Sequence, residues 1–223
     1  MKRTLLIALM LLGVTAVAQT RQQRLTEHVY YLAADSLQGR KAGTEYSRKA
    51  ASYIQRQYEE IGLKPFFGDW FLFFAPGGEN SSIGAKYMDV VGVIEGSDPQ
   101  LKNEYIVLGA HFDHLGVRRG KVYNGADDNA SGSAALIEVA RELYARRDCL
   151  KRSVIIAAFD AEELGLWGAK ALADTLVKAV GQDRIKLMMS LDMVGWYTAS
   201  GKLKLEGAAT IKDGQRILTE EAG

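Results

Sequence analysis

Short apolar runs alternate with amphipathic stretches along most of the chain. Four runs rich in Val, Ile or Leu predict buried strands, at residues 88–94, 105–110, 153–159 and 186–191. Apolar residues at helical spacing predict two helices, at residues 130–146 and 165–180. Because helices alternate with strands that are apolar on both faces, the pattern predicts an α/β fold in three layers, with a mostly parallel central sheet and helices on both faces.

The segment before these strands is predicted to be helical in two pieces. Apolar residues between positions 25 and 32 mark the first helix, and residues 35–43 interrupt the pattern. Thr44 is a typical N-cap for the second helix, which we expect to end at Gly62. Residues 64–87 are rich in aromatic residues, Gly, Asn and Ser, and predict an irregular crossing with some edge-strand content.

The first 18 residues have a different pattern. Lys2 and Arg3 precede an apolar run at residues 5–17, and residues 16–18 (AVA) match the small-x-small pattern that signal peptidase recognises. The run is too short to cross a bilayer, so residues 1–18 are predicted to be a cleaved signal peptide. We therefore expect a secreted or periplasmic protein whose mature chain has no membrane span.

Composition and charge add two exclusions. At 223 residues, 48% of them hydrophobic, the chain is long enough for one domain with a sizeable core. Loss of residues 1–18 would take away two basic residues and no acidic one, which changes the formal net charge from +1 to −1. That balance gives no sign of a nucleic-acid partner. The single cysteine, Cys149, excludes an internal disulfide.

Chemically versatile side chains stand where the apolar runs end. They are His111 and Asp113 after the second strand, Asp128 before a helix, Glu162 and Glu163 after the third strand, and Asp192 after the fourth. Ligands of open sheets gather outside the carboxyl ends of the strands, and buried charges are costly unless they meet a cation or each other. These residues are therefore expected to share one site.

A pair of divalent metal ions is the predicted occupant of this site. An imidazole combined with carboxylates suits Zn²⁺, and a bridging carboxylate allows two ions to clamp a hydrolysis. Asp113, two residues after His111 on the same extended segment, is expected to orient the imidazole. Glu162 is the candidate general base for a water molecule. His114, beside the predicted site, stays open between a structural role and a role in the pocket.

Several segments resemble the secreted di-zinc aminopeptidases of metallopeptidase family 28. The stretches that carry the resemblance are residues 109–116 (GAHFDHLG), 124–132 (NGADDNASG), 159–165 (FDAEELG) and 191–195 (LDMVG). Two upstream stretches, residues 35–40 (DSLQGR) and 61–65 (IGLKP), also resemble bacterial members. The resemblance begins near residue 24 and implies a zinc exopeptidase-like fold, peptide substrates and two Zn²⁺ ions in each complete site.

The resemblance also implies a role for each candidate residue. His111 and Asp192 would be terminal ligands of one zinc, and Asp128 would bridge both ions. Glu163 would bind the other zinc, Glu162 would be the base, and Asp113 would support His111.

One expected feature of the family has no counterpart in this sequence. The second zinc of the family takes a further histidine far downstream of the Asp192 motif, and no histidine follows His114 here. Residues 213–221 begin a predicted helix just before the sequence ends at residue 223. We therefore expect one zinc-peptidase domain at residues 19–223, incomplete at its C-terminus.

Three functions compete at this point. The first is an exopeptidase that removes N-terminal residues from peptides, the second is a glutaminyl cyclase with a single zinc, and the third is a non-catalytic ectodomain of the same fold. The DDNASG motif at residues 127–132 looks more like the peptidases, and every expected site position up to Asp192 is filled. The sequence leaves open the preferred residue, the choice between amino-, di- and carboxypeptidase activity, and the oligomeric state.

Overall fold

The computed structural model describes residues 19–78, residues 86–196 and five single positions between 201 and 210. The signal peptide expected at residues 1–18 and the helix expected from residue 213 lie outside the described residues. Within the described part, no helix is long and apolar enough to cross a membrane.

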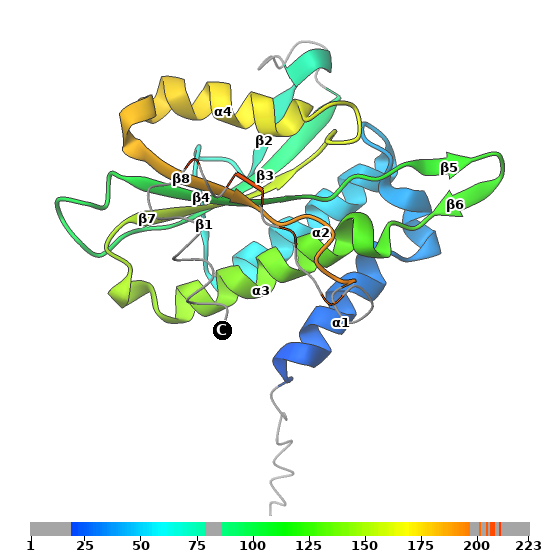
Figure 1. Ribbon diagram of the computed structural model, residues 1–223, viewed down its shortest axis with the longest axis horizontal. Coiled ribbons are helices and arrows are strands. Elements are labelled where there is room, and N and C mark those ends of the chain that lie inside the picture. Colours follow the sequence, from blue (N-terminus) through cyan, green and yellow to red (C-terminus); the bar gives the residue numbers. More distant parts are fainter. Residues whose placement is uncertain are drawn as a thin grey trace, which may run out of the picture.

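A six-stranded sheet forms the centre of the molecule (Figure 1), with strand order β1-β3-β7-β4-β8 and with β2 also paired to β3. The strands are β1 (Lys64–Pro65), β2 (Phe71–Phe74), β3 (Tyr87–Ile94), β4 (Tyr105–His111), β7 (Ser153–Phe159) and β8 (Ile185–Ser190). Each of the four strands predicted from apolar runs is present, with ends shifted by at most one residue. Apolar runs of this length therefore located the core strands correctly.

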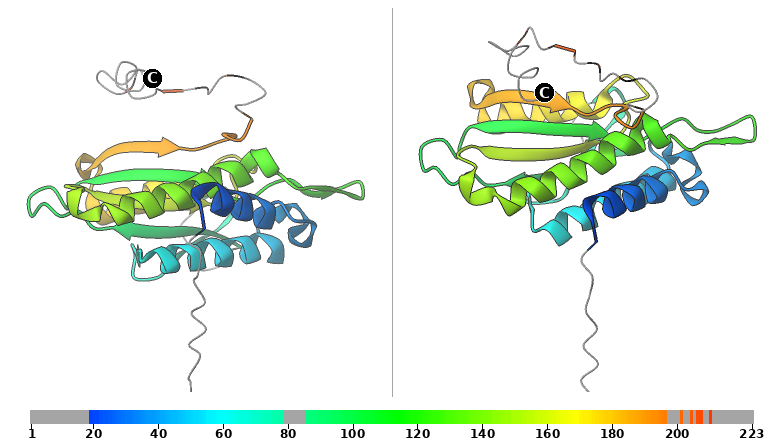
Figure 2. Two further views of the ribbon diagram at one scale, coloured as in Figure 1. Left: turned by 90° about the horizontal axis from the view of Figure 1, so that it is seen from below. Right: turned by 60° about the horizontal axis from the view of Figure 1, so that its bottom comes forward.

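Helices cover both faces of the sheet (Figure 2). They are α1 (Arg21–Leu32), α2 (Glu45–Ile61) and α3 (Gly132–Ala145) on one face, and α4 (Trp167–Val180) on the other. The central strand β7 serves both faces, because successive side chains alternate along a strand. Ile156 packs in the cluster beneath α1, α2 and α3, whereas its neighbour Ile155 packs in the cluster beneath α4. The predicted three-layer α/β arrangement is confirmed.

The sheet is mixed, however, and only its site-bearing part is parallel. β4 runs parallel to both β7 and β8, whereas β3 runs antiparallel to β7, and β1 and β2 run antiparallel to β3. The sheet is mixed because the connection between β3 and β4, at residues 95–104, contains no helix and returns the chain at the same end of the sheet. Parallel neighbours need a longer crossover, usually a helix. The expected parallel arrangement is therefore found only among β7, β4 and β8.

Helix α2 begins and ends where its caps predict. The Thr44 side-chain oxygen accepts the backbone N–H of Ser47 at 3.4 Å at the start of α2. Gly62 ends α2 in the left-handed conformation at φ 102°, which glycine adopts without steric cost. The interruption expected at residues 35–43 contains a short helical segment, η1 (Asp35–Arg40).

A two-stranded hairpin between β4 and α3 was not predicted. It consists of β5 (Gly116–Arg118) and β6 (Lys121–Tyr123) and projects from the body of the molecule (Figure 1). Its turn residues, Arg119 and Gly120, both have positive φ, at 51° and 73°. Two such residues form the tight turn that suits the twist of a hairpin.

Candidate metal centre

The structure brings all the predicted site residues to one edge of the sheet. His111 is the last residue of β4, Glu162 and Glu163 follow β7, and Asp192 follows β8. These three strands are parallel, so their carboxyl ends lie at the same edge. Asp128 lies in η3 (Ala126–Ser131), the irregular turn that leads into α3, and the Asp128–Asn129 peptide bond is cis.

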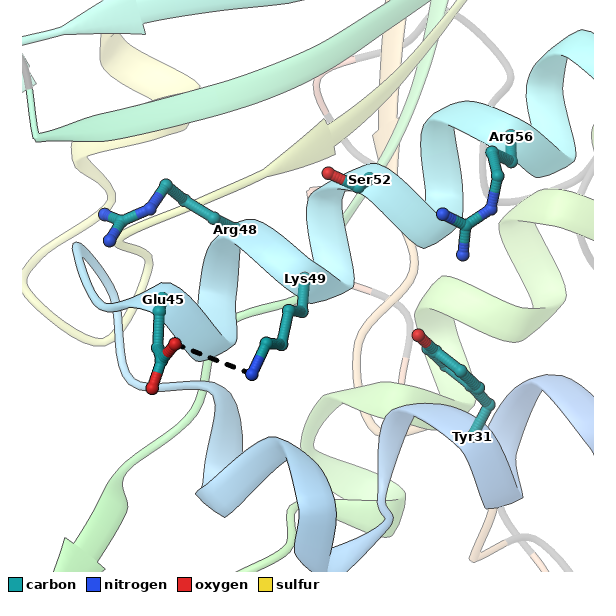
Figure 3. A pocket seen from close by; sticks show the side chains of 6 residues that line it. All are labelled: Tyr31, Glu45, Arg48, Lys49, Ser52 and Arg56. Carbon is teal, nitrogen blue, oxygen red and sulfur yellow. Dashed lines mark ion pairs between the residues drawn. The ribbon is translucent and has the colours of Figure 1, made fainter.

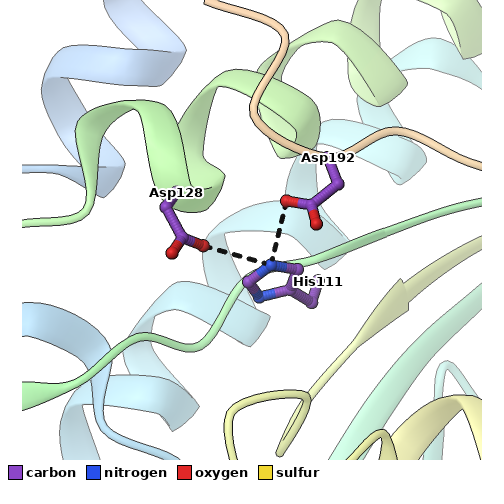
Figure 4. Close-up of side chains that lie close together, drawn as sticks. All are labelled: His111, Asp128 and Asp192. Carbon is purple, nitrogen blue, oxygen red and sulfur yellow. Dashed lines mark ion pairs between the residues drawn. The ribbon is translucent and has the colours of Figure 1, made fainter. Parts of the chain in front are cut away.

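His111, Asp128 and Asp192 form a first cluster with the spacing of metal ligands (Figure 4). The Nε2 atom of His111 lies 3.4 Å from Asp128 Oδ1 and 3.4 Å from Asp192 Oδ1. These distances are longer than an ordinary hydrogen bond of about 2.9 Å. Two corners of a tetrahedron of ligands about 2.0–2.1 Å from zinc are about 3.4 Å apart. This donor set and its spacing therefore fit a zinc ion.

The first cluster is partly open to solvent. The His111 side chain is 4% exposed, whereas the side chains of Asp128 and Asp192 are 39% and 56% exposed. A metal held here would have three protein ligands and access to solvent, as catalytic zinc sites do.

Asp113 supports both His111 and the Glu162-Glu163 pair. Nδ1 of His111 lies 3.2 Å from the Asp113 backbone oxygen and 3.6 Å from its Oδ1, which leaves Nε2 facing the cluster. The Asp113 carboxylate also accepts the backbone N–H of Glu162 at 3.0 Å and that of Glu163 at 3.3 Å. One buried carboxylate thus connects the end of β4 to the turn after β7.

Glu162 points its carboxylate at the same cluster. Its Oε2 lies 4.0 Å from His111 Nε2, and its side chain is 31% exposed. Partial burial raises the pKa of Glu162 above its usual range; the His111 charge lowers it and the surrounding carboxylates raise it. A carboxylate with a raised pKa, next to a metal site and in contact with solvent, is suited to accept a proton near neutral pH.

A second cluster contains His114, Asp128 and Glu163. Nδ1 of His114 lies 2.7 Å from Glu163 Oε1, which is a hydrogen-bond distance, and 3.8 Å from Asp128 Oδ2. Asp128 therefore presents one oxygen to each cluster. Glycine at position 125 permits this packing, because a Cβ there would lie 2.6 Å from the His114 ring. His114, whose role the sequence left open, lies within the site.

The negative charge around His111 changes its protonation. Burial opposes the imidazolium form, but contact with Asp113 and the charges of Asp113, Glu162 and Asp192 outweigh burial and raise the pKa of His111 to about 9. A divalent cation would replace the proton as the positive charge that this group of carboxylates requires.

Alternate residues of the DDNASG motif hold the Asp192 loop, a role that the sequence did not reveal. Asp127 Oδ1 accepts the backbone N–H of Gly195 at 2.8 Å, and the Asn129 side chain donates to the Leu191 carbonyl at 2.9 Å. Ser131 Oγ accepts the backbone N–H of residue 194 at 3.1 Å. Asp128, between these residues, is left free to face the site.

A surface hollow of about 330 Å³ between α1 and α2 lies apart from these residues (Figure 3). Its lining residues are Tyr31, Glu45, Arg48, Lys49, Ser52 and Arg56. Three of the six are cationic, and none is a predicted site residue. A cation would therefore be bound at the strand ends and not in this hollow.

The fold and the site thus define an α/β domain with a candidate metal centre at the carboxyl ends of its parallel strands. The family model described as Peptidase family M28 matches residues 89–219. The chain belongs to Peptidase family M28, which is a metallopeptidase family.

Two individual proteins are also similar to much of the chain. The chain is 31% identical over 179 residues to the uncharacterized protein YfbL of Escherichia coli (strain K12). The match covers 79% of this chain and 48% of YfbL. It is 26% identical over 163 residues to leucine aminopeptidase 1 of Sclerotinia sclerotiorum, covering 69% of this chain and 38% of that protein. The chain thus spans less than half the length of both relatives.

The fold also resembles that of a solved glutaminyl cyclase from an Acidobacteriales bacterium. The TM-score is 0.61 at 22% sequence identity, and the match covers 81% of this chain and 62% of the cyclase. At this identity the likeness concerns the fold alone. The architecture therefore does not separate peptidases from cyclases, and the choice between them depends on the site.

Proposed function

We propose that this protein is a zinc-dependent aminopeptidase that removes N-terminal residues from peptides. The observation that carries the proposal is the zinc-like spacing of His111, Asp128 and Asp192 beside the Glu162 carboxylate. Membership of Peptidase family M28 supports peptide substrates. The relative named leucine aminopeptidase 1 supports action at the amino end.

In the proposed complete site, which would take two Zn²⁺ ions, His111 and Asp192 would hold the first, Glu163 would hold the second, and Asp128 would be shared by both. Asp128 supports this assignment by presenting Oδ1 to one cluster and Oδ2 to the other. Bound zinc supplies a Lewis acid that lowers the pKa of water and polarises the peptide carbonyl.

Residues of the protein itself transfer the proton and orient the metal ligands. Glu162 accepts the proton of the attacking water and passes it to the leaving amine. A hydrogen bond to Asp113 holds the backbone of Glu162 and so directs its side chain toward the site. The carboxylate at the end of that side chain remains free to rotate. Asp113 also holds His111 with Nε2 directed at the cluster.

A direct test measures metal content. Protein that contains the complete site, saturated with zinc and freed of excess metal, should hold close to two ions per chain by elemental analysis, and Asp128→Ala should lose both. Asp174→Ala, an exposed change on α4, is the matched control and should keep both. A stoichiometry of one that Asp128→Ala leaves unchanged would reject the bridging role.

A second test separates the three candidate functions. The zinc-loaded protein should release p-nitroaniline from aminoacyl-p-nitroanilides and free amino acids from unblocked peptides. A glutaminyl cyclase would instead convert N-terminal glutamine to pyroglutamate with loss of ammonia, which mass spectrometry distinguishes. Absence of both reactions in protein that holds zinc would favour the non-catalytic ectodomain.

We also propose that the protein is exported and works in the periplasm or outside the cell. The basic, apolar and small-residue pattern of residues 1–18 supports this location. Mass spectrometry of the protein recovered outside the cytoplasm should find Gln19 at the N-terminus. Recovery of cytoplasmic protein that still begins at Met1 would reject the proposed export.

A further inference from the structure

Arg40 makes an unusual set of contacts in the DSLQGR segment, which the proposed chemistry does not use. The residue is fully buried at the end of η1. Its guanidinium donates to four backbone carbonyls, and the contact with Leu32 is a short one. The other three acceptors are the carbonyls of Phe112 at 2.7 Å, Asn124 at 2.6 Å and Gly125 at 3.0 Å.

These carbonyls belong to segments that carry the proposed zinc ligands. Phe112 directly follows His111, and Gly125 stands three residues before Asp128. A guanidinium is planar and presents its donors in a fixed fork. Simultaneous bonds to both segments therefore set the separation between the end of β4 and the loop that enters η3.

The backbone around Arg40 strengthens the same connection. The Arg40 carbonyl accepts the backbone N–H of His114 at 3.4 Å, and Lys41 forms a parallel bridge with His114. Gly39 has φ 67°, and a Cβ there would lie 2.8 Å from the Gly116 carbonyl oxygen. The segment thus lies directly against both ends of the β5–β6 hairpin.

The charge of Arg40 is costly where it lies. Among the described residues, no carboxylate is within ion-pair distance of its guanidinium, which bonds only to carbonyls. Burial lowers the pKa of Arg40 to about 10, while the charges of Asp113 and Asp128 raise it, so the side chain is charged at neutral pH. An apolar side chain of similar volume would avoid the desolvation cost but would leave these four carbonyls without their donor, so the role of the arginine is to bind the carbonyls and not only to fill space.

We propose that Arg40 is a positioning residue whose guanidinium fork holds the His111 strand end and the Asp128 loop at zinc-binding distance before the metal arrives. The inference rests on the proposed function, since it assumes that zinc binds between these residues. It concerns zinc affinity first and turnover only as a consequence.

Zinc affinity of two Arg40 variants tests the proposal. Arg40→Lys keeps the charge without the fork, and Arg40→Met removes both. Arg24→Met is the control, because Arg24 also stabilises the helical layer, through bonds to Glu138, but does not touch the site. Zinc dissociation constants come from competition with a chelator, and circular dichroism reports the folded fraction and melting temperature.

Both Arg40 variants should bind zinc about 10–100-fold more weakly than the wild type, the usual effect of removing a group that orients metal ligands. Arg24→Met should melt earlier yet bind zinc normally. Normal affinity in folded Arg40→Lys would overturn the proposal. Wild-type protein that binds no zinc would instead reject the proposed function, so the two failures are distinguishable.

A milder variant keeps the proposal testable if neither Arg40 variant folds. The Asn124 side chain donates to the Ala33 carbonyl at 2.9 Å and to Asp35 Oδ1 at 2.7 Å, and so anchors the same loop. Asn124→Ala should weaken zinc binding and alter the visible absorption of the Co²⁺-loaded protein, which reports ligand geometry. Unchanged affinity with an unchanged cobalt spectrum would show that the anchoring of this loop does not set zinc affinity, which contradicts the basis of the proposal.

Discussion

The carboxylate of Asp113, just after β4, accepts the backbone N–H of Glu162, just after the neighbouring parallel strand β7, at 3.0 Å. This bond fixes the backbone of the proposed base while its side chain remains partly exposed. Asp113 is itself fully buried, so its position is set by the core and not by solvent. The base is therefore held in place by a residue that lies beyond the reach of substrate.

Glu162→Gln should keep zinc and lose turnover. The amide preserves the shape of the side chain but does not accept a proton, so kcat should fall about 10²–10⁴-fold. Steady-state hydrolysis of an aminoacyl-p-nitroanilide, together with elemental analysis, checks both parts. Glu163→Gln is the comparison and should lose metal from one site. Near-normal hydrolysis by Glu162→Gln would show that the base lies elsewhere.

Zinc affinity should rise with pH up to about 9. The pKa of His111 in the metal-free protein is about 9, so the imidazole is protonated at pH 7 and zinc must displace that proton. Below pH 9, affinity should therefore fall about tenfold for each pH unit. Calorimetry at pH 7 in buffers of different ionisation enthalpy should detect one released proton. Zinc binding without proton release would contradict this assignment.

The two zinc ions should differ in affinity in a chain of residues 19–223. The first cluster has three ligand atoms at zinc-like spacing, whereas Glu163 in the second is hydrogen-bonded to His114 at 2.7 Å. We expect one tight and one weak ion in a chelator titration, with little peptidase activity when only the tight ion is bound. His114→Gln should change only the weak phase. Two equally tight ions would show that His114 serves as a full ligand.

Asp89→Asn should stabilise the protein, and more so at higher pH. Asp89 is fully buried, and its Oδ2 has no hydrogen-bond partner among the described residues. Burial raises the pKa of Asp89 well above its usual range, and the Asp160 and Asp113 charges add to this. The folded protein thus keeps a proton that the unfolded chain releases above about pH 4, so the free energy of unfolding falls as pH rises toward neutrality.

Asparagine resembles the protonated acid and removes this dependence. The gain in melting temperature from Asp89→Asn should therefore be larger at pH 7 than at pH 5. The exposed Asp174→Asn is the control and should show no such trend. An equal gain at both pH values would mean that Asp89 is not the group that binds the proton.

The sequence predicted the strands and the site edge because both follow from local patterns. A buried strand such as β7 appears as an uninterrupted apolar run, and residues just after it necessarily lie at its carboxyl end. Contacts to main-chain carbonyls, by contrast, have no sequence pattern that would predict them. Nothing in the DSLQGR segment indicates that Arg40 bonds to the carbonyls of Phe112 and Gly125, because any residue type offers the same acceptor. The β5–β6 hairpin does have a sequence signal, the Arg119-Gly120 pair at its turn.

The arrangement of the β5–β6 hairpin allows its turn to change in length or sequence without a change in the metal centre. Its base is clamped by the backbone of residues 39–41, while its turn at Arg119 and Gly120 projects away from the body (Figure 1). Insertions or sequence changes at the turn would therefore not be transmitted to His111 or Asp128. A longer turn is therefore expected to leave the chemistry at the base of the hairpin unchanged.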